Sequence, residues 1–472
     1  MADETSQITH QKAVRINLDG SRYGTFAEIG AGQETARWFF RVGGAAGTVA
    51  KSMSAYDMTV SDSIYGPSER YVSRQRLNTM LDHEYSLLIE RLGTSYGDTK
   101  NFFAFANTVA AKAYHSNKEC HGWLGVRFQS KPHSEPNNVR IHVRMLDKEN
   151  LQQQEALGII GVNLLYACCY HHDDTNGFLD SLLDGLTRDR IEIDLVLVDG
   201  PDYQQIDNRI LNVKLVHKGF TSAVVFAPGK QVLLAAEHIY NKPILIERGN
   251  FRPVTTINLQ MMEALREYFV ADFPNRHGDM IEIMEITLHN LLNQGNFDPR
   301  DFLARVDILE SLGKTVMISN YAEFHRLGAY LRRNTKEPIG IVVGILLLQQ
   351  IFDEKYYTDL EGGILESFGR LFKTDVKLYI YPSINEANGE TYTAENLRVA
   401  NHLRNLYKFL RDNNHIRAIS GTHQPMSVTY SSREVATLIA TNNPRWETLV
   451  TPEVAQLIKD HGYFGYHPNG RS

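Results

Sequence analysis

From about residue 190 onward the chain repeats one arrangement, in which a short apolar strand pattern ends in a polar turn and a helical pattern follows. The strand patterns are IEIDLVLV, TSAVVFA, KPILIE, KTVMIS and DVKLYIY. Helical patterns such as NLQMMEALREYF and DPRDFLARVDILESLG separate them. Short apolar strands that alternate with helices are typical of a mainly parallel sheet covered on both faces. The sequence therefore predicts an α/β fold with a doubly wound, mainly parallel sheet in the C-terminal part.

The segment before residue 190 has a different pattern. NNVRIHVRML alternates Val and Ile with Arg and His between Val139 and Arg144, which indicates a strand with one exposed face. GWLGVRFQ and the polar loop SKPHSEPNN precede it, so we expect an antiparallel strand pair here. Helical patterns flank this pair on both sides. The N-terminal part is therefore predicted to be an α+β region.

A chain of 472 residues exceeds what one compact core supports, so two or three domains are expected. The polar start of the chain favours a flexible terminus. The predicted parts are a flexible segment over residues 1–22, an N-terminal α+β domain over residues 23–189, a Rossmann-like α/β domain over residues 190–420, and a helical and loop tail over residues 421–472.

Cysteine usage and hydropathy indicate the compartment. The three cysteines include an adjacent pair, Cys168 and Cys169, and their odd number argues against a disulfide framework. The N-terminus lacks the apolar core of a signal peptide. The longest apolar run, residues 338–352, is shorter than the ~20 residues that span a bilayer, and it reads as a buried strand with or without the start of a helix. We expect a cytoplasmic protein without a membrane partner.

The net charge argues against a nucleic-acid partner. The formal net charge is −6, whereas nucleic-acid binding needs a concentrated basic surface. No metal site is expected either, because ligand spacings such as HExxH and CxxC are absent. A homo-oligomer is expected, since most soluble proteins of this kind form symmetric assemblies.

The stretch YGTFAEIGAGQETARWFF reads as a strand, a glycine turn and a helix. A dinucleotide fingerprint needs three glycines, but only Gly30 and Gly32 fit, and Thr35 stands where the third belongs. Glu34 also puts a carboxylate where a phosphate would bind. A tight structural bend is the favoured interpretation, and a phosphate cradle is the alternative.

A second glycine-rich run, GGAAG, follows closely. Its first residues, Gly43 and Gly44, could form a nest of backbone N–H groups for an anion. Small residues also allow close helix packing, which is the structural alternative. Gly30, Gly32, Gly43 and Gly44 are the candidate cofactor-binding residues, and the sequence names no particular cofactor.

Charged loops follow several of the predicted strands, namely VDGPDYQQIDNR, ERGNFRPVT and SNYAEFHR. Ligands of doubly wound sheets bind beyond the carboxyl ends of the strands, and guanidinium groups there suit phosphate or carboxylate. Turn, N-cap and surface-pair roles are the alternatives for the same residues. The candidate ligand-binding residues are Asp199, Asp202, Arg248, Arg252, Asn320, His325 and Arg326.

Several stretches together resemble a bacterial family of similar length. They include YGTFAEIGAGQ, FFRVGGAAGT, GPDYQQIDNR, ERGNFRPVT and ISNYAEFHRLGAYL, and the likeness runs roughly from Tyr23 to beyond Tyr381. Members carry the automatic names nicotinate-nucleotide adenylyltransferase and TonB-dependent receptor. The first name implies a His-x-Gly-His-like motif and the second an exported barrel, and the sequence shows neither feature. The resemblance therefore transfers no activity and no functional residue.

The sequence thus supports two functional hypotheses. The leading one is a cytosolic α/β protein that binds a phosphorylated or carboxylated small molecule, such as a nucleotide, at the strand ends. The residues identify no catalytic group, so this hypothesis stops at binding. The alternative is a non-enzymatic, self-assembling or scaffolding protein that forms a homo-oligomer or filament, with the polar loops merely solvated.

Overall fold

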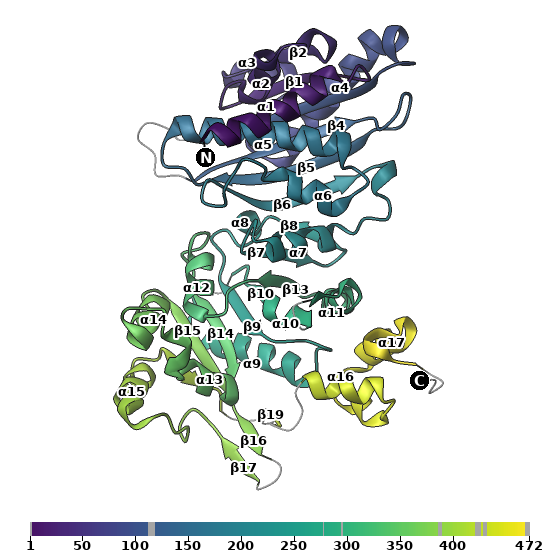
Figure 1. The fold of residues 1–472 in the computed structure, drawn as a ribbon. Coiled ribbons are helices and arrows are strands. Elements are labelled where there is room, and N and C mark those ends of the chain that lie inside the picture. The colour runs from purple at the N-terminus through teal and green to yellow at the C-terminus, as the bar shows by residue number, and fades with distance from the viewer. Residues whose placement is uncertain are drawn as a thin grey trace. The chain divides into compact units, whose positions relative to one another are not determined.

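The computed structural model of the chain describes residues 2–111, 119–276, 278–293, 296–385, 389–420, 426–427 and 432–467 (Figure 1). The chain divides into two compact units, Met1–Thr221 and Ser222–Ser472. Each unit has its own sheet and its own buried apolar core. This mixed architecture confirms the predicted α/β class.

The first unit is built on a six-stranded sheet with the order β2-β1-β3-β4-β5-β6. Its strands are β1 Arg22–Ile29, β2 Val49–Met53, β3 Asn101–Ala110, β4 Cys120–Phe128, β5 Asn137–Met145 and β6 Ile191–Asp199. Strands β2 and β3 run parallel to β1, whereas β3, β4, β5 and β6 pair antiparallel in turn. The antiparallel pair expected from the sequence is therefore present as part of a larger meander.

Helices cover both faces of this sheet. One face packs against α1 Ala2–Leu18, α2 Glu34–Val42, α5 Asn150–Tyr170, α6 Thr175–Leu182 and α7 Asn208–Lys218. On the other face lies α4 Arg74–Tyr96, whose Leu77 and Leu81 side chains lie against Gly125 of β4. In β5 the apolar residues between Val139 and Val143 are buried and the arginines are partly exposed, as the alternation predicts, but His142 of the polar face is buried as well.

The second unit is built on an eight-stranded sheet with the order β18-β15-β14-β9-β10-β13-β7-β8. Its strands are β7 Ala223–Ala227, β8 Gln231–Leu233, β9 Ile244–Arg248, β10 Ile281–Thr287, β13 Thr315–Ser319, β14 Ile339–Gly344, β15 Val376–Tyr381 and β18 Ile416–Ala418. Six neighbouring strands, from β18 to β13, run parallel, and β7 and β8 add an antiparallel edge. The mainly parallel sheet predicted for this part is confirmed.

Helices lie on both faces of the parallel sheet. On one face α9 Thr256–Asp272 packs its Leu265 and Phe269 against Gly340 of β14, and α11 Pro299–Ser311 lies beside β7 and β13. The opposite face carries α12 Phe324–Arg332, α13 Ile345–Ile351, α14 Gly363–Leu371 and α15 Arg404–Asp412. The sheet is therefore doubly wound. The apolar run 338–352 forms β14 and α13, and no described helix is both long and apolar enough to cross a bilayer.

The direction of the chain reverses in the middle of this sheet. From β9 the chain passes to β10 and then to β13, moving toward one edge. It then returns to the other side of β9 to form β14, and continues to β15 and β18 at the opposite edge. The connections that leave β9 and β14 therefore diverge, and such a reversal opens a crevice outside the carboxyl ends of the strands.

Two predicted boundaries differ from the observed ones. Residues 2–18 form α1 rather than a flexible segment, because Ala13 and Ile16 are fully buried and the Lys12 ammonium donates to Asn163 Oδ1 at 2.9 Å. The boundary at 189/190 also differs from the division after Thr221. Strand β6, assigned by sequence to the second domain, pairs with β5 and completes the first sheet.

Candidate functional site

A pocket of about 470 Å³ lies at the carboxyl ends of β9, β10 and β13 in the second unit. Residues that follow these strands line it, and so do residues of α13, which follows β14. The pocket therefore lies beside the reversal between β9 and β14. Its volume falls within the range typical of small-molecule sites, about 300–1,000 Å³.

A cross-strand ion pair forms the base of the pocket. Glu285 of β10 is fully buried and accepts from Nε and Nη2 of Arg248 at 2.6 and 2.9 Å. The Ser319 hydroxyl of β13 donates to the same carboxylate at 2.5 Å. Two-point contact with a guanidinium is the geometry in which a buried carboxylate is best compensated. Side chains from three adjacent strands, β9, β10 and β13, therefore form the base of the pocket.

Arg248 also positions the loop that closes one side of the pocket. Its Nη1 donates to Ala322 O at 2.6 Å and its Nη2 to Tyr321 O at 2.9 Å, and its guanidinium lies 4.2 Å from the centre of the Phe324 ring. Protein acceptors therefore take four of its five N–H groups. Arg248 builds the pocket more than it offers a free charge to a ligand.

The remaining lining is polar but largely uncharged. Three carboxamide side chains, Asn290, Asn320 and Gln350, face the pocket, and none of them hydrogen-bonds to another part of the described structure through its amide. The Tyr321 and Tyr356 rings line it as well, and Tyr356 is 47% exposed. Amides supply donors and acceptors, and tyrosines supply ring faces. This combination suits a polar ligand that contains a ring.

Of the predicted ligand-binding residues in this unit, Arg248 and Asn320 line the pocket and three others do not. Arg252 pairs with Asp301, and Arg326 pairs with Glu323 and Asp359. His325 is buried, bonds through Nδ1 to the Ser367 hydroxyl of α14 at 2.9 Å, and has its pKa lowered by burial. The helical turn directs His325 into the core, away from the pocket.

The predicted acids Asp199 and Asp202 belong to the first unit, at the end of β6 and in the turn that follows it. Asp199 ends β6, where it pairs with Arg140 and accepts from Asn138 Nδ2 at 2.7 Å. Asp202 accepts from Asn137 Nδ2 at 2.7 Å. The expectation that these acids end a strand of the same parallel sheet as Arg248 is therefore wrong, because β6 is antiparallel to β5 in the first unit. Their role in ligand binding stays a prediction.

The Glu28 carboxylate of β1 caps the helix that follows the glycine turn. Glu28 is fully buried and accepts from the N–H groups of Thr35 and Ala36 in the first turn of α2, at 3.2 and 2.9 Å. Asn107 Nδ2 donates to it at 2.8 Å. Burial raises the pKa of Glu28 to about 7, although these donors oppose the shift. The helix start that a phosphate would occupy therefore already carries an acidic group.

The backbone geometry at Gly30 and Gly32 explains why glycine occupies both positions. Gly30 has a φ of 103°, and a Cβ there would lie 2.0 Å from the Val109 carbonyl oxygen. Gly32 has a φ of 86°. Both positions favour glycine irrespective of any ligand. These contacts support the bend over the phosphate cradle.

Gly43 and Gly44 end α2. Gly43 is its C-cap, with a φ of 80°, and Gly44 has a φ of 78°. Asn17 Nδ2 of α1 donates to Phe39 O at 2.9 Å and to Gly43 O at 2.7 Å, which satisfies carbonyls at the helix end. This role explains the glycines without an anion, and their cofactor role stays a prediction.

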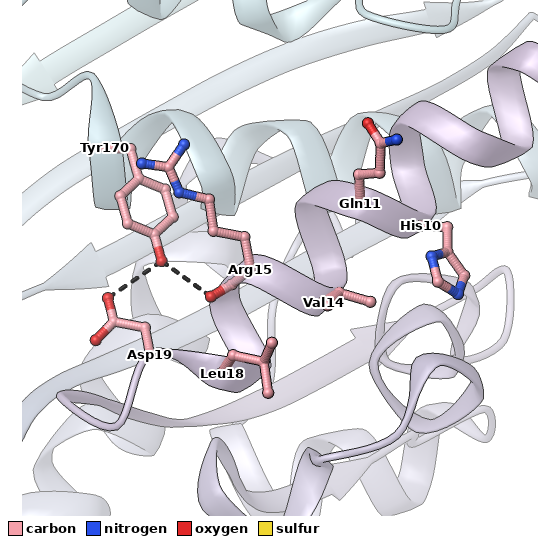
Figure 2. Close-up of a pocket in the computed structure, with 7 residues that line it drawn as sticks. All are labelled: His10, Gln11, Val14, Arg15, Leu18, Asp19 and Tyr170. Atoms are coloured by element: carbon pink, nitrogen blue, oxygen red, sulfur yellow. Dashed lines mark hydrogen bonds between the residues drawn. The ribbon is translucent and has the colours of Figure 1, made fainter.

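A second, shallow pocket of about 650 Å³ lies beside α1 in the first unit (Figure 2). The Tyr170 hydroxyl donates to Asp19 Oδ2 at 3.1 Å and contacts Arg15 O at 3.3 Å, and the Arg15 guanidinium lies 4.3 Å from the Tyr170 ring centre. Val14 and Leu18 also line it, and Leu18 is 76% exposed. The polar groups of Tyr170, Asp19 and Arg15 contact one another, and His10 and Gln11 add two further polar side chains to the lining.

A hydrogen-bonded pair of histidines on the first sheet, one of them fully buried, is absent from the sequence-based candidates. His142 Nδ1 lies 2.6 Å from Asp194 Oδ1, and its Nε2 lies 3.0 Å from His121 Nδ1. Burial, followed by the charge of His142, lowers the pKa of His121 to about 4. The alternation in β5 places His142 on the same face as Arg140 and Arg144. If β5 had been paired with IEIDLVLV, the contact between His142 and Asp194 would have been expected. No group of three metal-ligating side chains occurs among the described residues.

Over about a third of its length the chain is similar to solved structures. The competence/damage inducible protein CihA from Agrobacterium tumefaciens shares 18% identity over 34% of this chain and 94% of its own, with a TM-score of 0.26. A competence-damaged protein (CinA) superfamily protein from Klebsiella pneumoniae shares 14% identity over 35% of this chain and 98% of its own, with a TM-score of 0.27. TM-scores of this size do not establish a common fold. No family model and no curated protein matches the chain.

Proposed function

We propose that the second unit binds a polar small molecule, with nucleotides among the candidates, in the pocket at the carboxyl ends of β9, β10 and β13. The observation that carries this proposal is the position of the pocket beside the reversal of strand order. Numbered along the chain, the six parallel strands read 3-2-1-4-5-6 from β13 to β18. Rossmann dinucleotide-binding domains have the same order and bind their ligands at this reversal.

Two predicted residues keep a role in this proposal. Asn320 presents its amide to the pocket, and Arg248 fixes the wall while one N–H on its Nη1 has no acceptor among the described residues. That N–H could donate to a carboxylate or phosphate oxygen. Arg326 could do so only by leaving Glu323 and Asp359. The proposal is one of binding, and it assigns no reaction.

Thermal-shift and calorimetric titration of the full chain against nucleotides, nucleosides and sugars tests the proposal. Ligands that bind the native state raise the melting temperature by mass action. Gln350→Ala should weaken the interaction at least fivefold. Gln204→Ala makes the same change on an exposed turn of the first unit and should leave it unchanged. Binding that both variants retain at full strength would place the ligand elsewhere.

An exposed apolar segment supports the second candidate function, self-assembly. Tyr56, Met58 and Val60 are 80%, 62% and 49% exposed at the start of α3 Met58–Tyr65. Clustered exposed apolar side chains are typical of interaction surfaces. If copies of the chain meet there, Met58→Glu should shift the mass measured by light scattering toward the monomer, whereas Asp57→Asn should not.

We also propose that the protein works in the cytoplasm without a nucleic-acid or membrane partner. The buried cysteines Cys120, Cys168 and Cys169 form no disulfide. Cysteines outside disulfides suit a reducing compartment. Fractionation of cells that express the tagged chain tests this assignment, with recovery from an oxidising compartment as the contrary result.

A further inference from the structure

We infer that the pocket of the second unit selects an uncharged, hydroxyl-bearing ring over the phosphate ester of the same molecule. This inference rests on the proposed function, and it narrows the ligand class. Nucleosides and free sugars both belong to this ligand class. The preference follows from the pairing of charged side chains around the pocket.

Besides the exposed imidazole of His289, two opposite charges line the pocket, and each is neutralised by a protein partner. The guanidinium of Arg248 makes a two-point pair with buried Glu285. The carboxylate of Glu323 lies 3.2 Å from Nε of Arg326. Among the described lining residues these pairs leave no lysine or arginine without a carboxylate beside it. A phosphate would therefore enter without an uncompensated lysine or arginine to receive it.

Recruiting Arg248 for a phosphate would also disturb the pocket itself. Its bonds to Glu285 would have to break, which would leave a fully buried carboxylate without its counter-charge. Its bonds to Tyr321 and Ala322 hold the loop that forms the wall. The single remaining N–H can donate to one oxygen but cannot balance a dianion. The arrangement therefore disfavours a phosphate group and tolerates a neutral one.

The uncharged lining matches hydroxyl groups instead. The amides of Asn290, Asn320 and Gln350 each offer two donors and an acceptor, and a hydroxyl both donates and accepts. The Tyr321 and Tyr356 rings offer faces on which a base or a sugar ring can pack. Three amides beside two aromatic rings are a lining for a ring compound with several hydroxyl or amide groups.

Calorimetric titration of the full chain with adenosine, uridine, ribose, glucose and the two nucleoside 5′-monophosphates tests the inference. We expect a nucleoside or a sugar to bind at least tenfold more tightly than the matching monophosphate, and the nucleoside and sugar arms identify the source of the ring. A monophosphate that binds as tightly as its nucleoside, or more tightly, would overturn the inference while leaving the proposed function intact. The absence of binding by every compound would overturn both.

A charge variant separates the proposed cause from other reasons for the same preference. Glu323→Gln/Asp359→Asn removes both carboxylates that pair with Arg326 near the pocket, so it should improve monophosphate binding at least threefold and change nucleoside binding less. Glu263→Gln removes a carboxylate on the exposed side of α9 and should change the binding of neither compound. If both variants leave the preference between nucleoside and monophosphate unchanged, matched charge is not its cause.

Discussion

Arg248 and Glu285 join neighbouring strands of the second sheet through two hydrogen bonds of 2.6 and 2.9 Å, at the point where the candidate pocket begins. They are direct partners in the register of β9 and β10. The side chain of Arg248 is 9% exposed and that of Glu285 is fully buried. The pocket is therefore built on a buried ion pair in which each charge compensates the other.

Arg248→Met should destabilise the second unit by about 3–5 kcal/mol, because it leaves the buried Glu285 carboxylate without its counter-charge. The double variant Arg248→Met/Glu285→Gln should regain part of this loss. Arg266→Met removes a half-exposed pair with Glu282 and should cost less than about 1 kcal/mol. Urea unfolding, monitored by hydrogen exchange in β9 and β10, measures the free energy of unfolding of all three variants. Equal losses for Arg248→Met and Arg266→Met would contradict the structural role.

Glu247 should make the stability of the second unit fall as pH rises. Burial raises its pKa from 4.5 to about 8, and its Oε2 has no hydrogen-bond partner among the described residues. Between these pH values the folded state holds a proton that the unfolded state has lost, so the free energy of unfolding decreases with increasing pH up to about pH 8 and is flat above it.

Glu247→Gln removes this titration. The free energy of unfolding of the variant, relative to that of the parent chain, should therefore rise by roughly 1–4 kcal/mol between pH 5 and pH 8.5. The Gln oxygen can still accept from Asn258 Nδ2, which lies 2.6 Å from Glu247 Oε1. Differential scanning calorimetry across this pH range gives the comparison. A constant difference between the two proteins would show that Glu247 is ionised throughout.

Glu28→Gln should destabilise the first unit by about 2–3 kcal/mol, because the new amide would point N–H groups at donors already aimed at the carboxylate. Those donors are the backbone of Thr35 and Ala36 and the side chain of Asn107. Glu34→Gln changes a carboxylate at the same helix end that pairs loosely with Arg37 at 3.7 Å, and it should cost a few tenths of a kcal/mol. Thermal unfolding by circular dichroism distinguishes them, and comparable effects would mean that Glu28 does not cap α2.

Lys12→Met should release α1 from the first unit. The Lys12 ammonium donates to Asn163 Oδ1 and to both oxygens of Ser181 at 2.8–2.9 Å, and it pairs with Asp184. We expect hydrogen exchange over residues 7–18 to accelerate at least tenfold. Lys131→Met alters an exposed lysine and should change nothing. Unchanged protection of α1 in Lys12→Met would show that apolar packing alone holds this helix.

The strands of the second sheet were predictable because their apolar runs need burial on both faces, and KPILIE, KTVMIS and DVKLYIY became β9, β13 and β15. Strand β6 was misassigned for a physical reason visible in its residues. Glu192 and Asp194 alternate with Ile191 and Ile193, and this period of two marks a strand with one polar face in an antiparallel sheet. Reading IEIDLVLV as uniformly apolar placed it in the wrong unit.

The candidate site was half predictable. Arg248 and Asn320 were found because polar residues after parallel strands gather at one edge of the sheet. Glu285 was missed because IEIMEIT, now β10, was not recognised as a strand. The helix α1 was missed because its polar sequence hides the contacts of Lys12, which involve residues more than 150 positions away. Contacts so distant in sequence leave no local signal.

Hydrogen–deuterium exchange of the full chain, with and without the tightest-binding nucleoside or sugar, tests the central claim most directly. Binding in the pocket should slow exchange in residues 319–324 and 345–351, which form its walls, and leave the six strands of the first unit unchanged. Slowed exchange confined to the first unit, or no change in these two segments under saturating ligand, would contradict it.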